Sequence, residues 1–234
     1  MADADAGDDL DQLIRRVDPD RWLTSRFIGD PAARADVVAL YAYDHELARA
    51  RRVASNPLMA EIRLTWWREV LDEAFAGGSV RRHPVAEALA AAIRRRGLPR
   101  APLEAMIDGQ IEALEIAEWD ADGSIRCADA VEGSAAMLAA LVLDPQSPSD
   151  AAKAAGRAWG LVLLRRSGTV EAVVSDALLR QAIAEARDGV RALSAAAFPA
   201  ALPLRIARLE LGRGAAGPLA RRLALVLAVA LGRA

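Results

Sequence analysis

The side chains in this chain that could do chemistry lie mainly on two consecutive predicted helices. On the first, Tyr41, His45 and Arg52 are four and seven residues apart, so they share one helical face beside an apolar stripe. Arg49 lies next to that face, and Arg166 is a further basic candidate. Guanidinium groups bind phosphate oxygens well, so the three arginines could surround an anionic headgroup.

The same arginines have a more ordinary alternative. Asp44, Glu46 and Glu69 could pair with them as surface ion pairs, and we favour this alternative. For His45, a surface position and a ligand-binding position stay equally open.

The second helix carries two adjacent tryptophans, with Arg63 beside them. Trp66 and Trp67 point about 100° apart on a helix. One of them should therefore pack in the core while the other lines a cavity or a partner surface. Packing of both in the core is the alternative.

Local signals place the ends of these two helices. Asp30 before Pro31 and Asn56 before Pro57 are each an N-cap followed by a first-turn proline. Gly77 is a stop signal for the second helix.

Composition predicts an all-α fold. The chain has 234 residues, 53% of them apolar, and apolar segments of helical length recur between proline and glycine residues. We expect an acidic flexible tail over residues 1–12 and a single-domain bundle of about ten helices over residues 13–234. The 30 basic and 32 acidic side chains nearly balance, which makes nucleic acid an improbable partner.

The chain shows no secretory signal, so we expect a cytoplasmic location. The closing segment, residues 218–232, holds nine consecutive apolar residues after two arginines, too few to span a bilayer. We favour a buried last helix there, and peripheral contact with a membrane is the alternative. Cys127 is the only cysteine, and His45 and His83 are distant in sequence, so we expect a structural thiol and no metal site.

Several motifs together resemble the squalene and phytoene synthase family. They are Tyr41-Ala42-Tyr43, Trp67-Arg68, His83-Pro84-Val85, Ile107-Asp108-Gly109 and Gly156-x-Ala158. The resemblance covers about residues 20–212 and implies the isoprenoid synthase fold. It also implies a prenyl diphosphate ligand, which active members ionise with Mg²⁺ held by two clusters of aspartates.

Both clusters are lost under this resemblance. If Tyr41 is aligned on the family tyrosine, the first three aspartates fall on Ala48, Arg49 and Arg52. If Gly156 is aligned on the family glycine, the family's Gln, Asn and Asp fall on Gly160, Leu163 and Ser167. The family arginine remains as Arg166, or as Arg165 if the alignment slips by one residue. Glu171 stands near a later aspartate position.

A narrower resemblance, to the mitochondrial complex I assembly factors of this family, fits better. It rests on Asp44-His45-Glu46, on residues 62–68 (Ile-Arg-Leu-Thr-Trp-Trp-Arg) and on residues 198–204. It implies a non-catalytic protein without a cofactor that binds a prenyl lipid or a protein client and aids assembly of a respiratory complex. The alternative is an active prenyl-diphosphate transferase whose Mg²⁺ is held by Asp44, Glu46 and Glu112 within about 5 Å of one another.

We therefore expect no catalytic residue and no metal ligand, and a ligand cavity formed by ten side chains. The cavity candidates are Tyr41, Asp44, His45, Glu46, Arg49, Arg52, Arg63, Trp66, Trp67 and Arg166.

Overall fold

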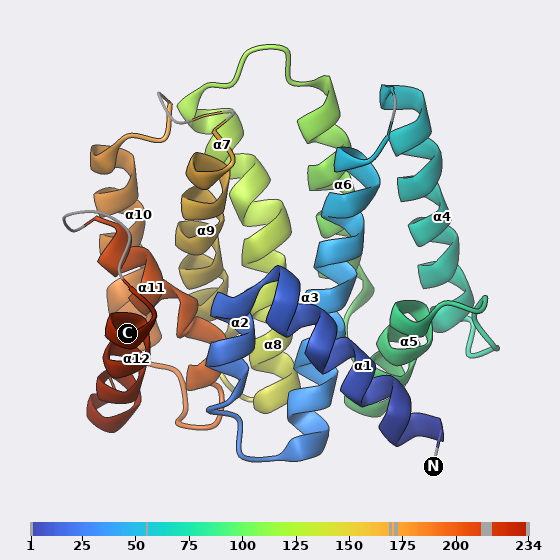
Figure 1. The fold of residues 1–234 in the computed structure, drawn as a ribbon, viewed down its shortest axis with the longest axis horizontal. Coiled ribbons are helices and arrows are strands. Elements are labelled where there is room, and N and C mark those ends of the chain that lie inside the picture. The colour runs from blue at the N-terminus through green and yellow to red at the C-terminus, as the bar shows by residue number, and fades with distance from the viewer. Residues whose placement is uncertain (1, 55, 169, 171–172, 212–216, 233–234) are drawn as a thin grey trace.

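The computed structural model of the chain describes residues 2–54, 56–168, 170, 173–211 and 217–232. Within these ranges every regular element is a helix, which confirms the all-α prediction (Figure 1). The elements are α1 (Ala2–Val17), α2 (Pro19–Ser25), α3 (Pro31–Arg52), α4 (Pro57–Phe75), α5 (Pro84–Arg96), α6 (Arg100–Glu115), α7 (Ala121–Ala128), the π-helical turn η1 (Asp129–Gly133), α8 (Ser134–Leu143), α9 (Ser149–Arg166), α10 (Asp176–Val190), the 3₁₀ turn η2 (Phe198–Ala201), α11 (Pro203–Glu210) and α12 (Pro218–Leu231). The segments α7, η1 and α8 follow one another without a break.

The predicted helix starts are confirmed at α3 and α4. The Asp30 carboxylate accepts hydrogen bonds from two backbone N–H groups of the first turn of α3, at 3.0 and 3.2 Å. The Asn56 side chain accepts one from the N–H of Met59 at 2.9 Å. Beyond α4, Gly77 takes a left-handed backbone conformation with φ of +78°, which favours glycine.

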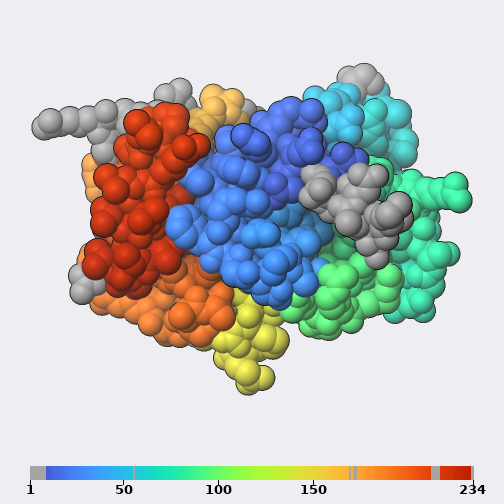
Figure 2. Space-filling model, turned by 60° about the horizontal axis from the view of Figure 1, so that its bottom comes forward, coloured from blue at the N-terminus to red at the C-terminus, as the bar shows by residue number. Residues whose placement is uncertain are grey.

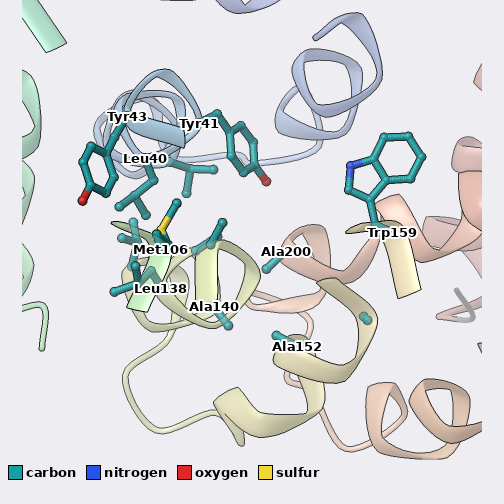
Figure 3. Close-up of a cluster of buried hydrophobic side chains, with 14 of the residues drawn as sticks. Leu40, Tyr41, Tyr43, Met106, Leu138, Ala140, Ala152, Trp159 and Ala200 are labelled. Atoms are coloured by element: carbon teal, nitrogen blue, oxygen red, sulfur yellow. The ribbon is translucent and has the colours of Figure 1, made fainter. Parts of the chain in front are cut away.

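The core lies between the long helices in the middle of the molecule. Leu40 of α3, Met106 of α6 and Leu138 of α8 are fully buried in one cluster, together with Trp159 of α9 (Figure 3). The hydroxyl of Tyr43, which is also fully buried, donates a hydrogen bond to a backbone carbonyl of α6 at 3.0 Å. These contacts hold α3, α6, α8 and α9 around a common centre.

The expected boundary between tail and domain at residue 12 coincides with no break in the structure. Helix α1 runs through it, from Ala2 to Val17. Leu10 and Ile14 are buried in the core, and Asp11 accepts a hydrogen bond from the indole of Trp22 at 2.9 Å. Two apolar side chains four residues apart face the same way on a helix, so this helix packs on both sides of the expected boundary.

The favoured prediction of a buried last helix is wrong for most of α12. Only Ala224, Leu225 and Ala228 are buried, and most of its other side chains are exposed. Across the described ranges, no helix combines the length and the apolar character needed to cross a membrane.

Candidate functional site

The upper ends of α3, α6, α7 and α9 in Figure 1, together with η1, surround a cavity of about 450 Å³, here called the central cavity. Its polar lining consists of Asp44, Arg51, Arg52, Gln110, Cys127, Glu132 and Ser167. Its apolar lining consists of Ala48, Trp119, Ala128, Val131, Leu163, Leu164 and Val170, with Gly160 between them. Asp44, Gln110 and Glu132 are buried and Arg52 is exposed, so the carboxylates lie at the inner end and Arg52 at the solvent end.

A buried ion cluster closes the inner end. The guanidinium of Arg21, on α2, donates to Asp44 of α3 at 2.6 Å and to Glu132 of η1 at 2.7 Å. It also contacts the carboxylate of Asp18, and it lies over the ring of Tyr41 at 4.8 Å from the centroid. One arginine thus joins three separate elements, and its side chain is only 6% exposed.

The charges of this cluster perturb one another. Burial raises the pKa of Glu132 well above its usual range, and the nearby Asp44 and Asp18 add to the shift while Arg21 opposes it. Burial alone would lower the pKa of Arg21, but Asp18, Glu132 and Asp44 raise it overall. A carboxyl group held beside another carboxylate in a buried site takes up a proton readily. In the folded protein the Glu132 carboxyl group therefore holds a proton to higher pH than a solvent-exposed glutamate does.

Two glycines of α9 make room for Glu132. A Cβ atom at Gly156 would lie 2.2 Å from the carbonyl oxygen of Glu132. A Cβ atom at Gly160 would lie 3.0 Å from the Cβ and Cγ atoms of the same residue. Since these positions lie one turn apart on α9, they form a flat strip on which η1 packs closely. The strip fixes where the Glu132 side chain enters the cavity.

Two adjacent arginines supply the positive charge of the central cavity. The Nε atom of Arg51 is buried without a hydrogen-bond partner. Burial lowers the pKa of Arg51, and the like charge of Arg52 lowers it further. Neither side chain has a carboxylate partner within the part of the chain that the structure describes. An unpaired, partly desolvated guanidinium in a cavity is a group that an anion would stabilise.

A second cavity, of about 420 Å³, lies between α3 and α4. Its lining comprises Glu46, Arg49, Ala50, Val53, Ile62, Arg63, Trp66, Trp67 and His83. Trp67 is buried against Tyr43, with ring centroids 5.3 Å apart, and Trp66 is half-buried. The two indoles pack edge to face at 4.9 Å. Arg49 and Glu46 form an ion pair at 3.2 Å.

Comparison with known proteins now decides the family. A family model for squalene/phytoene synthase matches residues 14–172, which is more than half of the chain. The chain belongs to the squalene/phytoene synthase family.

Two solved structures share the fold of this family member. One is a dehydrosqualene synthase in complex with ligand, with a TM-score of 0.70 and 18% identity, covering 98% of this chain and 96% of that one. The other is YisP from Bacillus subtilis subsp. subtilis strain 168, with a TM-score of 0.62 and 13% identity, covering 95% and 96%. At these identities the likeness shows the fold alone. No curated protein sequence matches the chain.

Five of the six positions that the resemblance aligned with the family's acids and amides line the central cavity: Ala48 and Arg52 of α3, Gly160 and Leu163 of α9, and Ser167 just after α9. The sixth, Arg49, lines the second cavity. None of these residues is a carboxylate. Glu171 lies outside the described residues.

The carboxylates that are present do not fit Mg²⁺. Asp44 and Glu132 both engage Arg21, while Glu46 pairs with Arg49 and Glu112 pairs with Arg126 at 3.0 Å. Among the described residues, no group of three or more histidine, cysteine, aspartate or glutamate side chains is placed to hold a metal ion. The alternative set of Asp44, Glu46 and Glu112 is therefore not brought together.

The remaining cavity candidates lie elsewhere. Arg166 binds Asp20 at 3.0 Å and Glu210 at 2.7 Å, and it lies over the Trp159 ring at 5.0 Å. These partners draw it away from the central cavity. His45 is half-buried, burial lowers its pKa, and it lines neither cavity. Arg165 pairs with an exposed aspartate of α10. Of the ten candidates, Asp44 and Arg52 line the central cavity, and Glu46, Arg49, Arg63, Trp66 and Trp67 line the second cavity. Arg166 forms separate ion pairs, Tyr41 lies under the Arg21 guanidinium, and His45 lines neither cavity.

Sequence reasoning missed Arg21, Arg51 and Glu132. Two signals for them existed. Asp18 before Pro19 is the same helix start as Asp30 before Pro31, and the Asp18 side chain caps α2 at the N–H of Arg21. Glu132 is a single acid inside a largely apolar segment, and a charge in such a segment needs a buried partner.

Proposed function

We propose that this protein binds an anionic prenyl lipid, such as a prenyl diphosphate, in the central cavity without a metal ion and without ionising it. The observation that carries the proposal is the pair of arginines, Arg51 and Arg52, that line this cavity and have no carboxylate partner among the described residues. The resemblance aligns Arg52 with one of the aspartates that hold the cations in a synthase of this family, and Arg51 is its neighbour in the chain.

The cavity suits both ends of such a ligand. Guanidinium groups can bind phosphate oxygens directly, so the headgroup belongs at the solvent end. The apolar chain would then lie against Val131, Leu163 and Leu164, which line the same space. A volume of about 450 Å³ lies within the range of small-molecule sites, about 300–1,000 Å³.

Ionisation of a diphosphate requires stabilisation of the leaving group by bound cations. In this chain the inner carboxylates of Asp44 and Glu132 engage Arg21. Arginine at position 52 would also repel a divalent cation. These features support binding of a ligand without its chemical conversion. They weigh against the alternative of an active prenyltransferase.

A role in assembly of a respiratory complex, with a protein client, rests on the resemblance to the assembly-factor branch. One feature supports a client. Exposed Val53 and Ile62 line the second cavity, and Leu58 and Met59, about one turn before Ile62 on α4, are also exposed. Exposed apolar side chains gathered in this way mark an interaction site. Substitution of Ile62 and Met59 by serine should then lower the yield of the assembled complex in cells, while exposed Thr65→Ser should not.

The ligand proposal is tested by equilibrium binding of farnesyl diphosphate, with Mg²⁺ and with EDTA. We expect equal binding in both and no release of pyrophosphate. Each charge-assisted hydrogen bond contributes about 1.5–3 kcal/mol, so Arg51→Ala with Arg52→Ala should weaken binding by at least roughly 100-fold. Arg94→Ala with Arg16→Ala removes the same charge from exposed positions on α5 and α1 and should leave binding unchanged.

Two results would contradict the proposal. One is binding that requires Mg²⁺ or leads to pyrophosphate release. The other is equal affinity for farnesol, because the headgroup would then contribute nothing.

A further inference from the structure

Helix α12 carries an apolar face that the rest of the chain leaves uncovered. Six of its large apolar side chains are between 39% and 79% exposed: Leu219, Leu223, Val226, Leu227, Val229 and Leu231. Figure 2 shows this helix, in red, lying along the surface at one end of the molecule. Such a concentration of exposed aliphatic side chains on one helix marks an interaction surface.

A basic groove adjoins this face. Two cavities, of about 370 and 240 Å³, lie between α10, α11 and α12 and share Arg187 and Arg208 in their linings. Arg180, Arg191 and Arg205 also line them. Leu227 and Leu231 line the smaller cavity, so the groove is continuous with the apolar face.

The positive charge of the groove is only partly compensated. Arg180 pairs with Asp176 at 3.6 Å, and Arg191 pairs with Asp188 at 3.4 Å. For Arg187 and Arg205, the described residues offer no carboxylate partner, and the Nε atom of Arg205 is buried without a hydrogen bond. Burial lowers the pKa of Arg208, and the like charges of Arg205 and Arg187 lower it further. The groove is thus a place where a negative group would relieve repulsion.

We propose that this end of the molecule docks on a bilayer that contains anionic phospholipid. Lipid phosphates bind in the groove at Arg187 and Arg205, while the exposed leucines of α12 enter the boundary between headgroups and acyl chains. A helix that lies in the membrane plane has this combination of basic and apolar side chains. The 14 residues of α12 are too few to span the hydrocarbon core.

A lipid surface fits these observations better than a protein does. The chain as a whole is almost neutral, with 30 basic and 32 acidic side chains, so the local excess of arginine beside leucine is specific to this end. A flat anionic surface can meet the exposed aliphatic side chains and the groove together. The inference is independent of the ligand in the central cavity, since no residue of that cavity lines the groove.

Vesicle flotation with the full chain tests the proposal. We expect flotation with vesicles of phosphatidylcholine mixed with phosphatidylglycerol, no flotation with phosphatidylcholine alone, and loss of flotation at high salt. Each arginine near such a surface contributes about 1 kcal/mol, so Arg187→Gln with Arg205→Gln should lower partitioning about 30-fold. Arg187→Gln alone, at an exposed position, should lower it about fivefold and guards against misfolding of the double variant.

Two further variants make the experiment specific. Leu223→Ser with Leu231→Ser should abolish flotation without changing thermal stability, because both side chains are exposed. Arg16→Gln with Arg94→Gln removes two charges elsewhere and should float like the wild type. The proposal is overturned if the wild type does not float, if the control pair loses as much as the groove pair, or if Leu223→Ser instead converts a dimer in solution to a monomer.

Discussion

Replacement of Arg21 by methionine should be among the most damaging single changes in this protein. Arg21 joins α2 to Asp44 of α3 and to Glu132 of η1, and its side chain is only 6% exposed. Methionine has a similar length and fills the space without charge. The change would leave two carboxyl groups close together in a buried site with no cation to balance them.

The expected loss follows from the burial of the partners. Breaking a buried ion pair by removal of one member costs about 3–5 kcal/mol. In a chain of 234 residues, each kcal/mol lowers Tm by about 2–4 °C. Arg21→Met should therefore lower Tm by roughly 6–20 °C.

The loss should also depend on pH. The pKa of Glu132 is raised in the folded protein, so between the unfolded and folded values the native state binds more protons. The free energy of unfolding then falls as pH rises through that window. Arg21 lowers the pKa of Glu132, so its removal should raise that pKa further. The pH range over which the free energy of unfolding falls should then extend to higher pH. The Tm difference between the variant and the wild type should be larger at pH 8 than at pH 5.

Thermal unfolding followed by circular dichroism at both pH values measures this difference. Glu132→Gln in the Arg21→Met background removes one of the stranded charges and should recover a large part of the loss at pH 8. Arg94→Met, on the exposed side of α5, is the matched control. A Tm drop below about 2 °C, or an equal drop at both pH values without recovery in the double variant, would refute the reasoning.

Three other changes test the packing and the buried groups. Gly156→Ala should lower the free energy of unfolding by about 2 kcal/mol in urea denaturation, since its Cβ would meet a backbone oxygen at 2.2 Å; Gly29→Ala, which meets nothing within 4 Å, should change it by less than about 0.5 kcal/mol. Burial raises the pKa of Cys127 to about 11. Alkylation of this thiol by iodoacetamide at pH 8 should therefore be on the order of 100-fold slower in the native than in the unfolded protein. Equal alkylation rates would contradict this prediction. Tyr43→Phe leaves a buried carbonyl without its donor at 3.0 Å and should cost about 1–3 kcal/mol in the same urea assay; an unchanged midpoint would show that this hydrogen bond adds nothing.

The helix starts could be predicted from sequence because they depend on neighbouring residues alone. Asp30 caps α3 through the N–H groups two and three residues on. Helical periodicity likewise accounts for part of the central cavity, which Ala48 and Arg52 both line. Ala48 and Arg52 are one turn apart, so they had to share a face.

The choice of arginines could not be carried over position by position. Ala48, Arg51 and Arg52 line the central cavity, whereas Arg49 lines the second cavity and pairs with Glu46. The ion-pair partners of Arg166 could not be predicted for a different reason. Its partner Asp20 is 146 residues away in sequence, and no local pattern encodes that contact.

The glycine at position 160 of α9 and the buried acid Glu132 on η1 depend on each other structurally. A side chain at position 160 would place its Cβ 2.9 Å from the Cβ of Ala128 and 3.0 Å from that of Glu132. Such distances are too short for packed carbon atoms, so any side chain at position 160 and the observed position of η1 exclude each other. With glycine at 160, η1 approaches α9 and Glu132 reaches Arg21, which ties the inner end of the cavity to α2. The ion pair between Arg21 and Glu132 therefore goes together with a glycine at position 160. Introducing a metal-binding side chain at position 160 would clash with Ala128 and Glu132 before it could help to form a cation site.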